Sequence, residues 1–172
     1  MFLGRAIISF IFVSLFLLTG CSVSLEDASE NAKGTFDEVL KSEKKEVNAE
    51  ASTFHYYLPP QFEVDTEDDN NIIFAYKDEP YILFVNLFEE QDSKVLYDSI
   101  KSSYPQTHLD HTLLEDGRLG YLLIAPVSGE EEGMHEVTVG IGGVRMTTVT
   151  ETSNIENSTK NMMEIVSSVT IK

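Results

Sequence analysis

The chain has 172 residues, of which 29 are acidic and 12 are basic, so its formal net charge at pH 7 is −17. So acidic a surface repels the phosphate groups of nucleic acids and anionic lipids, and we therefore expect no nucleic-acid partner. The length is sufficient for one domain with a substantial core, but short for two. Two interpretations of the acidity stay open: a solubilising surface, or a surface that binds cations or a basic protein.

The first 20 residues have the pattern of a removable export signal. An arginine near the N-terminus is followed by the uncharged stretch 6–18, which is too short to span a bilayer but has the length of a signal core. Leu18, Thr19 and Gly20 then precede Cys21, the only cysteine of the chain. This L-T-G-C run resembles the lipobox of bacterial lipoproteins. The resemblance implies cleavage after Gly20 and attachment of a diacylglyceryl lipid to Cys21.

Lipidation of Cys21 would attach the protein to the extracytoplasmic side of the cell membrane, because two or three fatty acyl chains, such as palmitate, hold a protein there stably. It would also leave no thiol for a disulfide, so the fold must be stable by packing alone. The mature chain would retain all 29 acidic residues and 11 of the 12 basic ones, a formal charge of −18. The sequence therefore predicts a lipid-anchored, acidic, extracytoplasmic protein.

Residues 21–53 differ in composition from the rest of the chain, being rich in Glu, Lys, Ala, Ser and Asn. We predict a partly helical, partly flexible acidic tether over this lipidated N-terminal segment. Gly34 interrupts a weak apolar pattern at helical spacing, and a partner-binding amphipathic helix over 35–45 is the less favoured alternative. The apolar positions are Leu25, Ala28, Ala32, Phe36, Val39 and Leu40.

From Phe54 onward, short strand-like runs alternate with turn residues, so we expect the globular domain to cover 54–172. Ser93–Tyr104 has apolar residues at helical spacing and ends before Pro105, which predicts an internal helix. The strands expected before this helix are 54–58, 62–66, 72–77 and 81–88.

Two hairpins are predicted in the second half of the chain. Asp116 and Gly117 form the strongest short turn signal in the sequence. Gly142 and Gly143 allow a second hairpin, or one long strand with a glycine bulge. The four strands that these turns would join are 108–115, 118–127, 134–141 and 144–150.

The chain ends in a predicted helix, because Ser153 and Glu156 have the spacing of a capping box and apolar residues follow at helical spacing to about Ser168. The pattern predicts an α+β fold: an antiparallel sheet of about seven strands, with an internal helix and a C-terminal helix packed on it. The globular part, 54–171, loosely resembles PsbP/Mog1-like domains in its opening YLPPQFEV element, its meander and internal helix, and its final helix after GIGGVRMTTVT. The resemblance implies a non-catalytic adaptor or assembly module.

A group of three acidic residues could be taken for a calcium site, but we do not favour that interpretation. Asp65, Glu67 and Asp69 have the spacing of the first ligands of a calcium loop. Asn70 and Tyr76 stand where an EF-hand needs glycine and glutamate. We therefore interpret this segment as a solvated hairpin turn.

Two other patterns also lack the context that their chemistry needs. His108 and His111 would converge on a metal only in a helix, because residues three apart in a strand point to opposite faces, and the turn signals around them favour a strand. Gly140, Gly142 and Gly143 are followed by a strand-like run, whereas a phosphate cradle needs a helix N-terminus there. We predict neither a metal site nor a phosphate site.

The aromatic side chains of the domain are interpreted as core residues rather than as the lining of a pocket. The mature domain has no nucleophile motif such as G-x-S-x-G, so we predict no catalytic residue and no cofactor. The aromatic residues concerned are Phe54, Tyr56, Tyr57, Tyr76, Tyr81, Phe84, Phe88, Tyr97, Tyr104 and Tyr121.

The favoured function is a membrane-anchored, non-catalytic module that binds or assembles with an envelope protein. An envelope hydrolase or wall-modifying enzyme is one alternative, and a cation-binding envelope protein is another. Histidines and carboxylates converging in a deep pocket would favour the enzyme, whereas an exposed apolar patch would favour the adaptor.

Overall fold

The computed structural model of the chain describes residues 23–77, 79–127, 129 and 133–172. Cys21 and the predicted cleavage residues Leu18, Thr19 and Gly20 lie outside this part of the chain. Within it, no helix is both long and apolar enough to cross a membrane.

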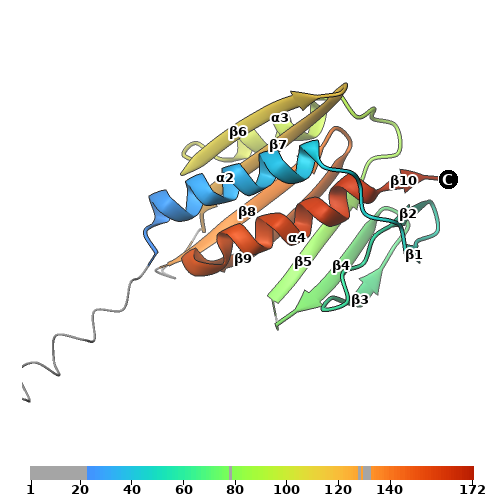
Figure 1. The fold of residues 1–172 in the computed structure, drawn as a ribbon, viewed down its shortest axis with the longest axis horizontal. Helices are drawn as coiled ribbons and strands as arrows, with labels where there is room; N and C mark the ends of the chain where they lie inside the picture. The colour runs from blue at the N-terminus through green and yellow to red at the C-terminus, as the bar shows by residue number, and fades with distance from the viewer. Residues whose placement is uncertain (1–22, 78, 128, 130–132) are drawn as a thin grey trace, which may run out of the picture.

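A seven-stranded sheet with the order β3-β4-β5-β9-β8-β7-β6 forms the centre of the fold (Figure 1). All neighbouring strands are antiparallel. The strands are β3 (Glu63–Glu67), β4 (Asn71–Tyr76), β5 (Glu79–Val85), β6 (Leu109–Glu115), β7 (Arg118–Pro126), β8 (Met134–Ile141) and β9 (Val144–Glu151). A smaller sheet pairs β1 (Ala49–Glu50) and β10 (Thr170–Ile171) with β2 (Phe54–Tyr56).

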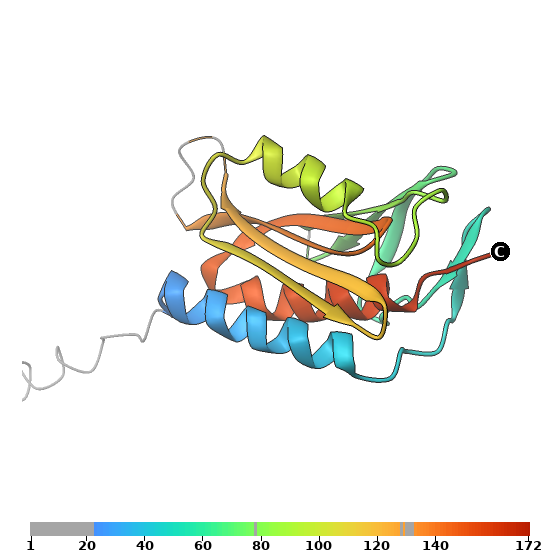
Figure 2. The same ribbon diagram turned by 90° about the horizontal axis from the view of Figure 1, so that it is seen from above.

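Helices cover the two faces of the large sheet unequally (Figure 2). On one face α2 (Leu25–Lys41) and α4 (Ile155–Ser168) lie side by side, and on the other lies the short helix α3 (Val95–Ser103). The main core fills the space between the sheet and the α2/α4 layer, and a smaller cluster lies under α3. Because helices cover both of its faces, β7 is buried along nearly its whole length, which explains its continuous apolar run. The predicted α+β fold is confirmed.

Both predicted hairpins are present. Asp116 and Gly117 join β6 to β7 with φ angles of 49° and 73°, the left-handed pair that a two-residue turn of this kind requires. Gly142, with φ 51°, turns β8 into β9, so the alternative of one long bulged strand is wrong.

The helical part of the tether predicted over 21–53 is present, but the prediction that it is a spacer outside the domain is wrong for the described residues. Ser24 caps α2 by accepting the Asp27 amide at 3.1 Å, and the helix runs through Gly34 to Lys41 without interruption. Its apolar stripe is a core face: Ala28, Ala32, Phe36 and Leu40 are buried in the main cluster against α4 and the sheet. The apolar stripe is weak in the sequence because two of its buried positions, Ala28 and Ala32, are alanines. Small side chains at these positions allow α2 to pack closely on its neighbours.

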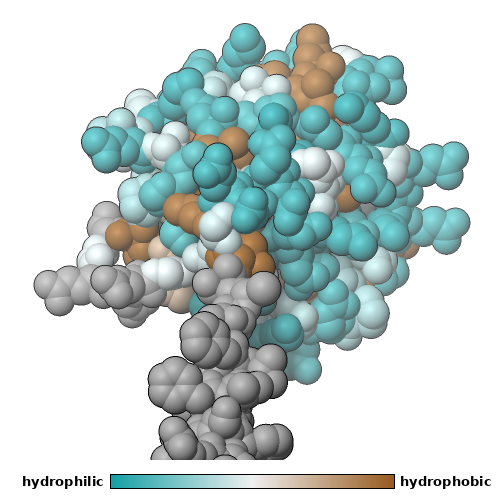
Figure 3. Space-filling view, turned by 60° about the vertical axis from the view of Figure 1, so that its left-hand side comes forward, coloured by the Kyte–Doolittle hydropathy of each residue, from teal (hydrophilic) through white to brown (hydrophobic). Residues whose placement is uncertain are grey.

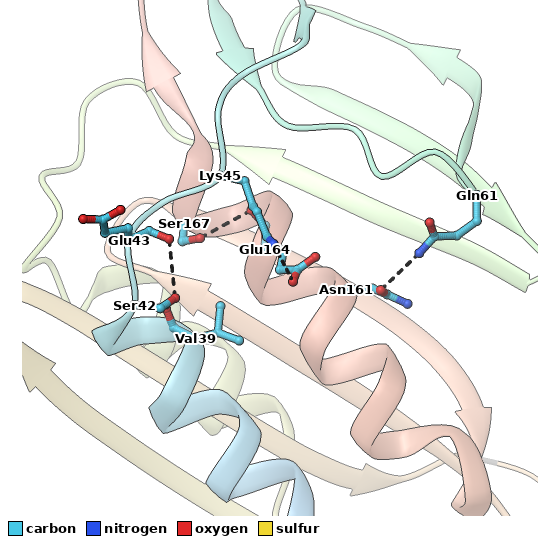
Figure 4. Close-up of polar contacts among 8 residues, drawn as sticks. All are labelled: Val39, Ser42, Glu43, Lys45, Gln61, Asn161, Glu164 and Ser167. Atoms are coloured by element: carbon cyan, nitrogen blue, oxygen red, sulfur yellow. Dashed lines mark hydrogen bonds and ion pairs between the residues drawn. The ribbon is translucent and has the colours of Figure 1, made fainter.

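The segment after α2 is also attached to the domain (Figure 4). Lys45 Nζ lies 3.5 Å from Glu164 Oε1 on α4. Asn48 exchanges two hydrogen bonds with the backbone of Leu58, at 3.0 and 2.7 Å. The domain therefore begins at Leu25 and not at residue 54, and only residues 22–24 separate it from Cys21 in the sequence.

The predicted C-terminal helix is present, but its capping box is not. A 3₁₀ turn, η2 (Thr152–Asn154), leads into α4, and the N-cap residue Asn154 makes no side-chain cap. Glu156 accepts a hydrogen bond from Thr35 Oγ1 on α2 instead, at 3.2 Å. Glu156 therefore links α4 to α2 and does not cap the N-terminus of its own helix.

Candidate functional site

The loop between β5 and α3 presents a phenylalanine to solvent. We name residues 86–93 the Phe88 loop. Phe88 is 94 % exposed, more than any other large hydrophobic residue of the described chain, so the prediction that it lies in the core is wrong. Its neighbour Leu87 packs against the main core. A single exposed apolar side chain is ordinary on a protein surface, so the significance of Phe88 depends on how its loop is held.

Hydrogen bonds fix the Phe88 loop to two neighbouring strands. The Asn86 amide donates to the carbonyl oxygen of Gly143 at the β8–β9 turn, at 2.8 Å. The amide of Leu119 on β7 donates to the carbonyl oxygen of Gln91, also at 2.8 Å. Within the loop, the Phe88 amide donates to Asn86 Oδ1 at 3.1 Å. The backbone that carries the ring is therefore immobilised on both sides.

Two glycines allow the Phe88 loop to pack directly on the β8–β9 turn. A Cβ atom at Gly142 would lie 2.1 Å from the Glu90 carbonyl oxygen, and one at Gly143 would lie 2.7 Å from the Glu89 Cβ. The prediction that these glycines form a turn is confirmed. Their second role, making room for a distant loop, has no signal in the local sequence.

The surroundings of Phe88 are acidic and partly apolar. Glu89 accepts a short hydrogen bond from Ser93 Oγ, whereas the side chains of Glu90 and Asp92 are exposed. None of these three carboxylates forms an ion pair within the part of the chain that the structure describes. An exposed aromatic side chain with carboxylates nearby is complementary to an apolar pocket that has basic residues at its edge.

Two further exposed apolar residues lie at the same end of the molecule. Val95 opens α3 directly after the Phe88 loop. Leu114 pairs across the β6–β7 hairpin with Leu119, the residue whose amide holds Gln91. This end of the molecule therefore carries exposed apolar side chains as well as charged ones.

His108 and His111 contact different partners. As predicted, His108 and His111 do not converge: His111 Nε2 lies 2.8 Å from Asp37 Oδ1 on α2, whereas the His108 ring packs edge-on against His135 with centroids 5.3 Å apart. Among the residues with described positions, no three potential ligands gather. Burial, followed by the neighbouring His108, lowers the pKa of His135. The sequence gives no signal for this pair, because the two residues meet only across the fold.

The predicted solvated turn around Asp65, Glu67 and Asp69 is confirmed. All of β3 is exposed, and Asp69 accepts hydrogen bonds from Ser52 and Thr53 rather than facing the other two acids. Four of the ten aromatic residues predicted to lie in the core are buried: Phe54, Tyr56, Tyr81 and Tyr121. Four others are partly buried against the two core clusters: Tyr76, Phe84, Tyr97 and Tyr104.

A hollow of about 630 Å³ lies at the N-terminus of α2, where it is lined by His108 and three acidic residues of the helix. The carboxylates Glu26, Asp27 and Glu30 are all exposed to solvent. The residues described here thus do not form the deep pocket of converging histidines and carboxylates that would favour a hydrolase.

No protein-family model matches the sequence, and no curated protein sequence matches it either. Among solved structures, a similar chain is the solution structure of cyanobacterial PsbP (CyanoP) from Synechocystis sp. PCC 6803. The two are 11 % identical with a TM-score of 0.42, and the match covers 69 % of this chain and 86 % of that chain. That protein belongs to the domain class named by the loose sequence resemblance. At this identity and TM-score the similarity transfers neither site residues nor function.

Proposed function

We propose that this protein is a lipid-anchored, extracytoplasmic, non-catalytic module that uses the Phe88 loop to bind an envelope protein. The observation that carries the proposal is Phe88 itself, a ring 94 % exposed on an immobilised backbone. Aromatic side chains dominate the binding energy of many protein interfaces. A loop that is already fixed loses little conformational entropy on binding, which favours its use as a recognition element.

The start of α2, the described element nearest to Cys21 in the sequence, and the Phe88 loop lie at opposite ends of the domain (Figures 1 and 2). Leu25, the first residue of α2, lines the same hollow as Leu109, the first residue of β6. The Phe88 loop packs at the other end, on the β8–β9 turn and the start of β7. The length of β6, about 20 Å, separates the two ends. A lipid on Cys21 would therefore hold the domain with Phe88 directed away from the membrane.

The charge of the proposed membrane-proximal end supports anchoring by lipid rather than by the protein surface. Hydrophilic residues cover most of the face that Figure 3 shows, with smaller hydrophobic groups between them. Glu26, Asp27 and Glu30 are exposed near the start of α2 and would repel anionic headgroups. The acidic residues beside Phe88 likewise oppose insertion of the ring into an anionic membrane, which favours a protein partner.

Site-specific photo-crosslinking in the cells that make this protein tests the proposal. A benzophenone amino acid at position 88 should give a defined adduct, and the same probe at Val64, an exposed apolar residue of β3, should not. Phe88→Ala should abolish co-purification of the captured protein, whereas Val64→Ala should preserve it. No adduct at position 88, or capture that survives Phe88→Ala, would refute the partner site.

The anchor is tested separately. Cys21→Ser should release the protein from the membrane fraction. A native protein whose mass shows an intact leader or an unmodified thiol would refute the lipoprotein assignment without affecting the Phe88 result.

A further inference from the structure

A groove of about 290 Å³ lies on the open face of the sheet, beside α3. α3 covers the β7 side of this face and leaves Ile82 on β5 exposed. The polar residues that line the groove come from α3 and its C-terminal end and from the β8–β9 hairpin: Ser99, Ser103, Tyr104, Glu136, Thr138, Arg145 and Thr147.

Arg145 is positioned to receive a carboxylate. Its guanidinium lies over the Phe84 ring, with Cζ 5.4 Å from the ring centroid. Within the described chain it forms neither an ion pair nor a side-chain hydrogen bond, although Lys45 and Lys101 both have acidic partners. A guanidinium whose N–H donors are not used within the protein can bind a carboxylate through two hydrogen bonds.

Glu136 supplies the opposite charge in the same groove. Tyr104 donates a short hydrogen bond to Glu136 Oε1, which fixes the carboxylate. Burial and then this hydrogen bond raise the pKa of Tyr104, so the phenol stays a neutral donor at physiological pH. The second oxygen of Glu136, Oε2, makes no hydrogen bond within the described residues and is free to accept from an ammonium group.

The spacing of these charges sets the length of a ligand. Arg145 faces Gly140 across the β8–β9 pair, four residues from Glu136, so the Cα atoms of Arg145 and Glu136 are separated by about 13 Å along the strand direction. An extended peptide of three residues spans about 10 Å, which leaves room for the two side chains. Between them, Thr138 and Thr147 form a hydrogen bond through their hydroxyl groups, which lie 2.9 Å apart, and the half-buried Thr147 is the more accessible of the two to a ligand backbone.

From this arrangement we infer that the groove binds a short zwitterionic peptide, with its carboxylate on Arg145 and its ammonium group on Glu136. A simple anion would be repelled by a chain of charge −17, whereas a zwitterion carries no net charge. This inference is independent of the Phe88 loop and of the lipid anchor.

Calorimetric titration of the full chain in detergent with triglycine tests the inference. Arg145→Met keeps an apolar stem on Phe84, and Glu136→Gln keeps an acceptor for Tyr104. Each should weaken binding by about tenfold or more, because hydrogen bonds to charged groups are strong. Lys101→Met, on α3 but outside the groove, is the matched control and should leave the affinity unchanged.

Modified probes separate the two ends of the ligand. Triglycine amide should lose the contribution of Arg145, and N-acetyl-triglycine should lose that of Glu136. Thermal unfolding of each variant checks that it is folded. Absence of triglycine binding at millimolar concentration, affinity unchanged in folded Arg145→Met, or equal binding of the three probes would each overturn the inference.

Discussion

Gly142 lies against the backbone of Glu90, so closely that a Cβ atom at position 142 would come within 2.1 Å of the Glu90 carbonyl oxygen. The two residues belong to different parts of the sequence, and their contact joins the β8–β9 turn to the loop that carries Phe88. Gly142 also has a φ angle of 51°, which side-chain-bearing residues rarely adopt. One glycine thus meets a conformational and a steric requirement together.

Gly142→Ala is therefore expected to destabilise the protein by about 2–4 kcal/mol, from backbone strain and displacement of the loop. Gly34→Ala is the matched control. Gly34 lies within α2 with nothing near its missing side chain, so the same substitution should stabilise by about 0.5–1 kcal/mol. Urea unfolding measures both changes, and equal effects of the two substitutions would contradict this view of Gly142.

The second prediction concerns α2 and its place in the domain. Phe36 is fully buried in the main core, so Phe36→Ala should destabilise by about 3–5 kcal/mol. Val47 is exposed in the segment after α2, and Val47→Ala should change stability by less than about 0.5 kcal/mol. Denaturant unfolding curves would show the difference. Wild-type stability in Phe36→Ala would mean that α2 is a spacer after all.

Elements with a local signal were predictable from the sequence. The turn at Asp116 and Gly117 needs a left-handed pair of residues, and asparagine, aspartate and glycine are the residues that supply one. The helices α3 and α4 were predictable because their apolar residues recur at helical spacing within a short stretch of sequence. The role of α2 was not predictable, because Ala28 and Ala32 contribute little hydrophobic signal. Their burial depends on α4, which is more than a hundred residues away in the sequence.

The candidate site could not be predicted from the sequence alone. Phe88 ends a strongly apolar run, and nothing local distinguishes it from the buried Val85. The exposure of its ring follows from a loop conformation that the distant Gly142 and Gly143 permit. Arg145 and Glu136 likewise line a groove only because α3 packs beside their strands in the folded protein. Functional geometry of this kind is a tertiary property.

The third prediction follows from the lowered pKa of His135, caused by burial and then by His108. The unfolded chain takes up a proton near the ordinary histidine pKa of about 6.5, while folded His135 stays neutral to lower pH. The stabilisation is therefore complete above about pH 6.5 and is lost progressively as the pH falls below that value. Unfolding free energies measured between pH 8 and pH 5 should decrease toward acid.

His135→Gln should reduce this pH dependence, whereas His55→Gln, which removes a histidine on β2, should retain the part that we attribute to His135. An unchanged slope in His135→Gln would assign the acid sensitivity to other groups. The substitution also tests the hydrogen bond between His135 Nε2 and Thr152 Oγ1, which are 2.9 Å apart, through a loss of stability at pH 8, where histidine titration no longer contributes.

The last prediction separates recognition from folding at Phe88. Because the ring is 94 % exposed, Phe88→Ala should change stability by less than about 0.5 kcal/mol. The same substitution at Phe74, which is fully buried on β4, should cost about 3–5 kcal/mol. Urea unfolding of the two variants measures this contrast. If Phe88→Ala were instead as damaging as Phe74→Ala, the ring would serve the fold, and its exposure could no longer be explained by a partner.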